Sequence, residues 1–456
     1  MLTRDQRSRV RQIGWIIGLC MLAVLPCRAQ AAQAPPLPDP VRVSTGTSEE
    51  PRISGLLITW TDVTGFIGAG GGLRTAYCLM DPMTQVCPVQ YVPETAGGQI
   101  HPDVDGQFII WQREIGWKSN SPIFVYDTVR QQLWTLGDGI LPRISGRRLV
   151  WARVVDAVTA QRDLFTCLFD PETGACPEEV VADSPDSQVL ADLEQDLVVW
   201  FEPRGVSGGA VFYRDLGIPG SPIQDINSAG SPRLGPTASR AILQDGILER
   251  VLVWPTFFSD RQARDLHWCR VPGGEACFGE PLTNDEDLES GADLSGPFLV
   301  WMGSDDPKQG TVKLLDLRHA DLPPIIVSTP DTDDAPLFQQ DPAISGNRVV
   351  WKEGVISGNQ PHRPLEIHYR VIPVQFLRGD ADMDGKVNLT DAIFILQYLF
   401  QGGPVPPILD AADVNDDAKL DITDPIQLLQ HLFLGGPPPA GPFPVAGLDL
   451  SPDPLN

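Results

Sequence analysis

Residues 51–60 read PRISGLLITW, and residues 142–151 read PRISGRRLVW, which shares the PRISG start and the final tryptophan. Each copy combines a proline, a short Ser-Gly turn and an apolar run that ends in tryptophan. Related copies are HPDVDGQFIIW (101–111), LADLEQDLVVW (190–200), VLVW (251–254), ADLSGPFLVW (292–301) and PAISGNRVVW (342–351). Subtracting the tryptophan positions 60, 111, 151, 200, 254, 301 and 351 gives spacings of 51, 40, 49, 54, 47 and 50 residues. A strand-rich repeat of this period predicts a mainly β fold, a β-propeller.

The segments between these copies also indicate strands. SPIFVYD (121–127), QQLWTLG (131–137) and DLFTCLFD (163–170) are rich in β-branched and aromatic residues, and Gly, Pro or Asp turns separate them. A large residue at a fixed place on an inner strand packs between neighbouring sheets. We therefore expect the repeated tryptophans in the core, not in a ligand-binding row.

The two ends of the repeat region are expected to meet in one sheet. The last copy supplies only two clear strands, 348–352 and 365–371, and VRVS at 41–44 stands where a third is needed. If the N-terminal strand completes the last sheet, closure leaves no open edge. Counting all copies gives seven blades, or six if the degenerate fifth copy, from Pro232 to Trp254, is an insertion.

These repeats, over residues 40–373, resemble the TolB-like propellers, whose blades open with a proline, a Ser-Asp-Gly turn and an apolar strand. Here ISG replaces the usual turn of that family, which more often has six blades. The resemblance implies the propeller fold and binding along its axis or at one face. It implies no reaction, because propellers host many functions.

Two acidic loops in residues 376–436 have the spacing of calcium ligands. In the first loop, positions one, three, five, seven, nine and twelve are Asp380, Asp382, Asp384, Lys386, Asn388 and Asp391. In the second loop, 33 residues later, they are Asp413, Asn415, Asp417, Lys419, Asp421 and Asp424. Calcium takes six to eight oxygen ligands, so we expect one Ca²⁺ in each loop, with both lysines contributing backbone carbonyls.

Each loop leads into an apolar helix, expected over 392–400 and 425–433, with Pro425 at the first helical position of the second. Gly385 occupies the sixth position of the first loop, where the chain turns sharply. Ala418 stands there in the second loop, and its Cβ is expected to strain the turn. The second calcium site is therefore expected to be the weaker one.

A calcium loop followed by a helix, given twice, resembles the type I dockerin rather than a complete EF-hand pair. In cellulosomes, dockerins bind cohesin domains on scaffold proteins and attach carbohydrate-active enzymes to them. Positions ten and eleven carry cohesin recognition in that family, which often has a small polar residue at position ten. Here these positions are Leu389-Thr390 and Ile422-Thr423. The resemblance implies a cohesin-like partner, and this departure leaves open a calcium-stiffened cap or a contact for another secreted protein.

Both ends of the chain lie outside these modules. Residues 1–34 are typical of a signal peptide, with four arginines before residue 12, an apolar run at 13–25 and Ala-Gln-Ala at 29–31 and 32–34. That apolar run is too short to span a bilayer comfortably. The protein is therefore expected to be secreted, extracellular or at the cell surface, or else periplasmic. Residues 437–456 are expected to form an irregular, proline-rich tail, in which Phe443 and Leu448 could contact the calcium module.

The six cysteines after the signal peptide fall into three local pairs, each around turn-forming residues. Two strands joined by such a turn bring their sulfurs face to face. We therefore expect the disulfides Cys78–Cys87, Cys167–Cys176 and Cys269–Cys277. An oxidising compartment follows from them.

Composition and motifs narrow the function. The 456-residue chain has a formal net charge of −25, which disfavours nucleic acid and anionic membranes as partners, and no later segment resembles a transmembrane span. HExxH and P-loop motifs are missing. The leading hypothesis is a non-enzymatic secreted propeller that binds a protein or glycan, with calcium stabilising its C-terminal module. The alternatives are a polysaccharide-active enzyme (a glycoside hydrolase or lyase) carrying a dockerin, and a structural cell-surface component.

Overall fold

The computed structural model describes residues 37–456 except 65–71, 82–83, 115–118, 205–207, 227–230, 233–234, 243–247, 259–262, 272–278, 285–286, 305–309, 329–336, 358–359, 362–364, 450–454 and 456. The predicted signal peptide and Cys277 lie outside the described residues. The chain divides into two compact units, Met1–Leu37 and Pro38–Asn456, and every described strand and helix belongs to the second.

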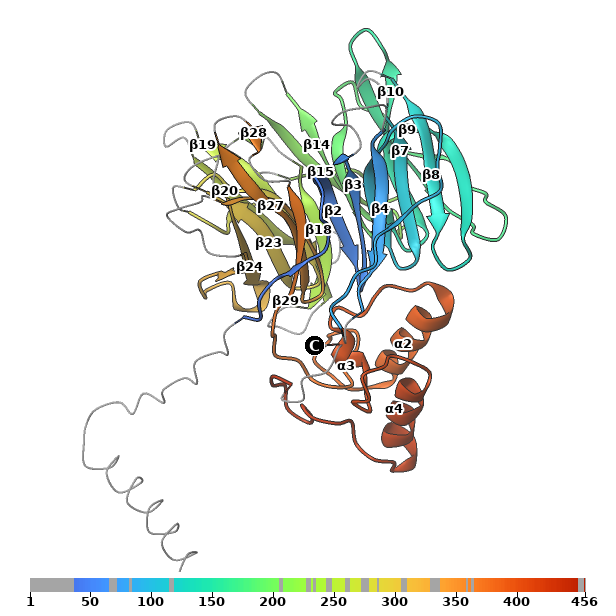
Figure 1. Ribbon diagram of the computed structural model, residues 1–456, viewed down its shortest axis with the longest axis vertical. Coiled ribbons are helices and arrows are strands. Elements are labelled where there is room, and N and C mark those ends of the chain that lie inside the picture. Colours follow the sequence, from blue (N-terminus) through green and yellow to red (C-terminus); the bar gives the residue numbers. More distant parts are fainter. Residues whose placement is uncertain are drawn as a thin grey trace, which may run out of the picture. The chain divides into compact units, whose positions relative to one another are not determined.

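Antiparallel sheets make up most of the described chain (Figure 1). The first sheet contains β2 (Ser48–Ser54), β3 (Leu57–Asp62), β4 (Arg74–Leu79) and β5 (Gln90–Tyr91). The second contains β6 (Gln99–Asp105), β7 (Phe108–Arg113), β8 (Ser121–Asp127), β9 (Gln132–Ser145), β10 (Arg148–Asp156), β11 (Gln161–Leu168) and β12 (Glu179–Ala182). The third contains β13 (Val189–Glu194), β14 (Leu197–Pro203), β15 (Gly209–Asp215) and β16 (Gln224–Ile226).

The remaining sheets continue the same order of strands. The fourth contains β17 (Ser231–Pro232), β18 (Thr237–Ile242), β19 (Leu248–Phe258), β20 (Ala263–Val271) and β21 (Glu280–Pro281). The fifth contains β22 (Ser290–Ser295), β23 (Phe298–Gly303), β24 (Thr311–Asp316) and β25 (Ile325–Ile326), with a 3₁₀ turn at Leu317–His319. The last contains β26 (Leu337–Ser345), β27 (Arg348–Ser357), β28 (Gln360–Pro361), β29 (Glu366–Val371) and β1 (Val41–Arg42).

The N-terminal strand completes the last sheet, which confirms the predicted closure. Val41 pairs with Tyr369 and Arg42 with His368 in antiparallel register. The seven-stranded second sheet departs from expectation, because the strand predicted at 131–137 runs on without a turn through Ser145. It therefore pairs with β8 at one end and with β10 at the other.

The repeated tryptophans lie in the core, as predicted. Each sits on the second strand of its repeat, and none is more than 2% exposed. The first strands, β2, β6, β9, β13, β18, β22 and β26, contact one another in that order, and β26 contacts β2. The strands that precede each tryptophan strand thus form a closed ring.

The repeated Ser-Gly turn has a clear structural role in this ring. The Ser345 hydroxyl accepts a hydrogen bond from the Gly55 amide at 2.9 Å, and the Ser54 hydroxyl accepts one from Gly106 at 3.0 Å. The same bond joins Ser295 to Gly346 at 2.8 Å. Three neighbouring pairs of turns are therefore joined in this way, and the bond from Gly55 to Ser345 joins the last turn to the first.

The local disulfides agree with the predicted pairing as far as the described residues extend. Cys78 is bonded to Cys87 and Cys167 to Cys176, with Cα–Cα distances of 5.3 and 5.2 Å. Cys269 is also disulfide-bonded.

The C-terminal module contains α2 (Leu389–Gln401), α3 (Leu409–Ala412) and α4 (Thr423–Leu434). Helices α2 and α4 contact each other over a small core that includes Ile395 and Leu428 (Figure 1). Both begin before the predicted residues, because side-chain oxygens of Asn388 and Asp421 accept the amides of Thr390 and Thr423. Pro425 is consequently the third residue of α4 and not the first.

The chain after α4 contacts the module, as suggested for Phe443. The rings of His431 and Phe443 meet edge to face at 5.5 Å, and Phe376 forms a bridge with Gly447. Within the described residues, no helix is both long and apolar enough to cross a membrane.

Candidate metal centre

The first acidic loop brings three carboxylates to one point. Single oxygens of Asp380, Asp382 and Asp384 all lie within 4.8 Å of one another. The loop is folded by its own amides, because Gly385 donates to Asp380 Oδ2 at 3.0 Å and Lys386 donates to Asp384 Oδ1 at 2.8 Å. Gly385 has a φ of +78°, which supports the sharp turn predicted at this position.

Asp391, the twelfth loop residue, accepts backbone hydrogen bonds from both ends of this loop. Its Oδ1 accepts the Ala381 amide and its Oδ2 accepts the Asn388 amide, both at 2.8 Å. Asn388 in turn caps α2 through the Thr390 amide, so Asp391 and Asn388 form a capping box. The side chain of Lys386 is exposed.

Two carboxylates of this loop, those of Asp380 and Asp391, hold protons more tightly than ordinary aspartates. Burial, reinforced by Asp382 and Asp384, raises the pKa of Asp380 to about 7. Burial, with Asp382 and Asp380 adding to it, raises the pKa of Asp391 to about 8. Like charges gathered in a half-buried site favour protonation unless a cation neutralises them.

The residues present fit a calcium ion. Asp380 Oδ1 is buried and makes no hydrogen bond with the described residues, so one carboxylate oxygen lacks a partner inside the loop. A buried acceptor without a partner costs free energy, and a hard cation would supply that partner. Oxygen donors from one tight loop are the ligand type that Ca²⁺ prefers.

The second loop has the same backbone plan, with Asn415 at position three in place of an aspartate. The Asp413 carboxylate accepts the Ala418 amide at 2.9 Å, and Asp424 accepts the amides of Val414 and Asp421. Asn415 Oδ1 is buried and has no hydrogen-bond partner among the described residues. Ala418 has a φ of +66°, as expected from the missing glycine. The side chains of Asp417 and Lys419 are exposed.

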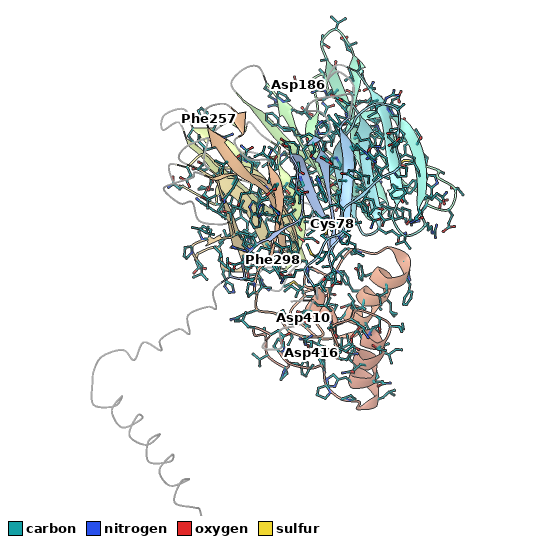
Figure 2. All side chains as sticks on the ribbon, in the orientation of Figure 1. Cys78, Asp186, Phe257, Phe298, Asp410 and Asp416 are labelled. Carbon is teal, nitrogen blue, oxygen red and sulfur yellow. A yellow bond between two sulfur atoms is a disulfide. The ribbon has the colours of Figure 1, made fainter. Side chains whose placement is uncertain are left out.

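A second group of carboxylates lies near this loop and is neutralised within the chain. Asp410, Asp416 and Asp449 surround the buried guanidinium of Arg378, at 2.7, 3.0 and 3.0 Å (Asp410 and Asp416 are labelled in Figure 2). Arg378 therefore occupies the place that a metal would take in such a group. No sequence pattern indicates this arrangement, because its members are distant along the chain.

The two helices present equivalent apolar residues to solvent. Leu389, Ile393 and Phe400 are exposed on α2 or at its start. Ile422, Ile426 and Phe433, each 33 residues later, are exposed at the corresponding places of α4. Positions ten of the two loops thus belong to two matching apolar stripes.

Sequence reasoning missed a charged cavity enclosed by the ring of first strands. Its volume is about 720 Å³, and its lining includes Arg52, Asp103, Arg143, Asp192 and Asp293. Pro404 and Val405, from the loop after α2, also line it. One sequence signal could have indicated this cavity. In five copies of the repeat, an Arg or Asp directly follows the proline or alanine near the start of the copy, and these residues are Arg52, Asp103, Arg143, Asp192 and Asp293.

Comparison with known proteins identifies the C-terminal module. Residues 378–433 match the family model of the dockerin type I domain. Dockerin domains bind calcium and cohesins, and dockerin proteins are typically extracellular or at the cell surface. A comparison with curated proteins finds no match.

Solved structures similar to the chain contain β-propellers. The β-propeller domain of the trilobed protease from Pyrococcus furiosus is 10% identical, with a TM-score of 0.47 over 72% of this chain and 94% of that chain. Puromycin hydrolase is 10% identical, with a TM-score of 0.49 over 74% of this chain and 58% of that chain. TolB from Acinetobacter baumannii is 12% identical, with a TM-score of 0.35 over 54% of this chain and 58% of that chain. The match to a Pyrococcus horikoshii acylaminoacyl peptidase covers about half of that enzyme, 51%. None of these similarities indicates an activity for this chain.

Proposed function

From the type I dockerin domain at residues 378–433, we propose that this is a secreted binding protein that docks, with calcium, onto a cohesin-like module of a partner protein. Docking presents a seven-bladed propeller, which binds a protein or a glycan. Local disulfides support the extracellular setting, because such bonds persist in oxidising compartments. The closed ring of first strands supports seven blades.

One observation carries the docking proposal. Each acidic loop ends at the start of a helix that exposes an apolar stripe, and the two loop–helix units correspond residue by residue. Asp380, Asp382, Asp384, Asn388, Asp391 and the Lys386 carbonyl would hold one Ca²⁺. Asp413, Asn415, Asp417, Asp421, Asp424 and the Lys419 carbonyl would hold another. Bound Ca²⁺ would neutralise the loop carboxylates, and each loop would then fix the position of the helix that follows it.

The apolar residues at position ten suggest the chemistry of the partner surface. Leu389 and Ile422 are 46% and 42% exposed, although both are large and apolar. Exposed apolar groups at matching places indicate a contact surface. A cohesin-like partner is therefore expected to offer an apolar patch here.

Binding of the full chain to type I cohesin modules, followed by calorimetry, tests this proposal. We expect saturable binding in calcium that is lost in EDTA. The double variant Leu389→Ser/Ile422→Ser is expected to weaken binding at least about tenfold, since each buried apolar side chain contributes about 1.5–3 kcal/mol. Val129→Ser, which alters a residue 72% exposed on the propeller, is the matched control.

Two outcomes would count against docking. Cohesin binding that is unchanged in EDTA would show that docking does not require calcium in the two loops. If no cohesin binds although calcium stabilises the chain, the module is a calcium-stiffened cap.

A polysaccharide-active enzyme is the second candidate, and the carboxylates in the cavity favour it. Burial, with Asp192 close by, raises the pKa of Asp293 to about 7, a value suited to a general acid. Reducing-end release from a polysaccharide panel tests this candidate. Turnover abolished by Asp293→Asn would establish an enzyme, and no turnover on any polymer would leave the binding role.

A further inference from the structure

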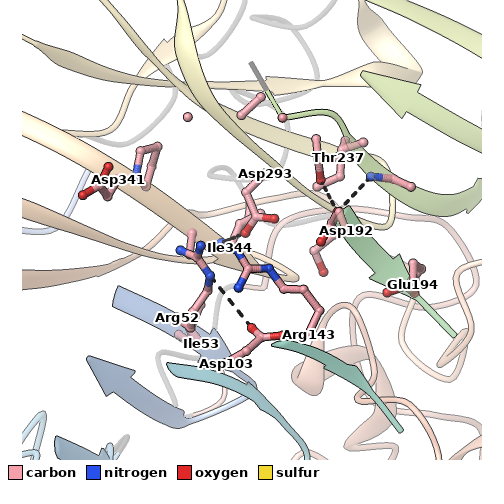
Figure 3. Close-up of a pocket in the computed structure, with 18 of the residues that line it drawn as sticks. Arg52, Ile53, Asp103, Arg143, Asp192, Glu194, Thr237, Asp293, Asp341 and Ile344 are labelled. Atoms are coloured by element: carbon pink, nitrogen blue, oxygen red, sulfur yellow. Dashed lines mark hydrogen bonds and ion pairs between the residues drawn. The ribbon is translucent and has the colours of Figure 1, made fainter. Parts of the chain in front are cut away.

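Seven side chains, at equivalent positions of the first strands, form a ring around the cavity (Figure 3). Each is paired across its hairpin with the residue that precedes the repeated tryptophan. The pairs are Arg52–Thr59, Asp103–Ile110, Arg143–Val150, Asp192–Val199, Thr237–Val253, Asp293–Val300 and Ala343–Val350. The register of the sheets therefore sets the lining of the cavity.

Charge is distributed unevenly around this ring. Asp103 lies between the two arginine positions, and its Oδ1 is 3.9 Å from Arg52 Nε. This side of the ring has two guanidiniums and one carboxylate. The other side has Asp192 and Asp293, separated by Thr237 and followed by Ala343, with no basic residue among them. Among the seven ring positions, both arginines therefore lie on one side, and Asp192 and Asp293 lie on the other.

Part of each charged group remains for a ligand. Asp192 Oδ2 accepts the Thr237 hydroxyl at 2.8 Å, and Asp293 Oδ2 accepts the Ile344 amide at 2.8 Å. The hydrogen bonds described for these carboxylates end on Oδ2. The described hydrogen bond of the Arg143 guanidinium goes from Nη1 to the Pro142 carbonyl at 3.1 Å. Within the described residues, no other hydrogen bond of this guanidinium is found, although Asp103 and Glu50 interact with it electrostatically.

We propose that this cavity binds a small zwitterion, of the size of an amino acid or short peptide. Its carboxylate lies against Arg143 and Arg52, and its ammonium group lies between Asp192 and Asp293. A volume of about 720 Å³ suits a small molecule and far exceeds a single metal ion. This proposal deepens the binding role proposed for the propeller and does not depend on the calcium loops.

The protonation of Asp293 agrees with this arrangement. Burial and then Asp192 raise its pKa, Arg52 and the Ile344 amide lower it, and Asp103 raises it again. The other charged groups of the cavity are Glu50, Asp105, Glu194, Arg264 and Asp341. Glu50 is 2.6 Å from His101, and Asp341 is 2.9 Å from Lys352. A bound ammonium group would favour the ionised form of Asp293. The affinity for the zwitterion should therefore fall about tenfold as the pH is lowered through the pKa of Asp293.

Calorimetry of the full chain in calcium tests the proposal, with triglycine, N-acetyl-triglycine and triglycine amide as probes. The acetyl group removes the ammonium charge, and the amide removes the carboxylate. We expect saturable binding of triglycine, weakened at least about tenfold by either cap, since one charge-assisted contact is worth about 1.5–3 kcal/mol.

Two variants assign the two ends of the ligand. Asp293→Asn, which still accepts the Ile344 amide, should remove the preference for triglycine over its N-acetyl form. Arg143→Gln should remove the preference for triglycine over its amide. Asp321→Asn removes one negative charge, as Asp293→Asn does, but at an exposed position. This control variant should keep both preferences.

The proposal fails if triglycine gives no saturable heat at millimolar concentration while the chain stays folded by circular dichroism. It also fails if the three probes bind equally, or if both variants keep both preferences. None of these outcomes depends on cohesin, so they are distinct from a failure of calcium-dependent docking.

Discussion

Gly346 and Gly146 occupy the same place in the repeated Ser-Gly turn and have nearly the same φ, +58° and +57°. A Cβ at Gly346 would overlap the Pro407 carbonyl oxygen, whereas nothing lies within 4 Å of a Cβ at Gly146. Either change to alanine forces a side chain into left-handed backbone and costs roughly 1–2 kcal/mol. We expect Gly346→Ala to cost clearly more than Gly146→Ala in chemical unfolding. Equal losses would show that the loop before α3 does not constrain this turn.

Ala418 and Gly385 offer a reciprocal test at the sixth position of the two acidic loops. Ala418→Gly should relieve its φ of +66° and stabilise the calcium-loaded chain by roughly 0.5–1 kcal/mol. Gly385→Ala should have the opposite effect, although nothing lies within 4 Å of its Cβ. Calcium titration calorimetry checks both, with the tighter calcium binding expected for Ala418→Gly. A weaker second site in that variant would contradict the strain argument.

Single residues could be predicted where their own type carries the information. The burial of the tryptophans could be predicted because large apolar groups need a core, and the clustering of Asp380, Asp382 and Asp384 because they alternate in one tight loop. The partners of Ser345 and Arg378 could not be predicted. Ser345 bonds to Gly55, which is 290 residues away along the chain, and Arg378 bonds to Asp449, which is 71 residues away. The pattern within one repeat does not say which repeat is next to it in space.

The first calcium loop carries a prediction about pH. The folded-state pKa values of Asp380 and Asp391, about 7 and about 8, lie above the value of 3.8 for an ordinary aspartate. Without calcium, the folded chain therefore holds extra protons, and its stability should fall as the pH rises from the ordinary value through these pKa values. Bound calcium replaces those protons, so its stabilising effect should grow over the same window.

Thermal unfolding by circular dichroism, with calcium and with EDTA, checks this dependence. We expect the difference in Tm between the two conditions to be larger near pH 8 than near pH 5, because protons compete with the ion for the same oxygens. Asp380→Asn should reduce that difference at the higher pH. A difference that does not change with pH would argue against calcium at these carboxylates.

The boundaries of elements were harder to predict than their existence. Helix α4 begins at Thr423, whose amide donates to Asp421 Oδ1, so Pro425 falls in the first turn without being its first residue. Strand β9 continues past residue 137, where the predicted strand ended, as far as Ser145. Its residues pair with a different neighbour at each end, which keeps their backbone groups hydrogen-bonded.

At the scale of the whole molecule, the chain after α4 ties the calcium module together. Arg378 Nε donates to the Gly441 carbonyl at 2.6 Å, and its Nη2 is 3.0 Å from Asp449. Arg378 and Asp410 are both fully buried, so their ion pair depends on complete satisfaction of the guanidinium. The tail predicted as irregular is therefore part of the fold of this module.

Removing residues 437–456 should destabilise the module by several kcal/mol, because a buried guanidinium loses two of its partners and a broken buried pair costs about 3–5 kcal/mol. The loss of the Phe443 ring from His431 adds to this. Far-UV circular dichroism should show a lower melting temperature for the helical signal, only partly restored by excess calcium. Val445→Ser, at an exposed site in the tail, is the control and should melt like the parent chain. If the truncated chain melted like the parent, Arg378 would be satisfied by Asp410 and Asp416 alone, and calcium rather than the tail would hold the two loop–helix units together.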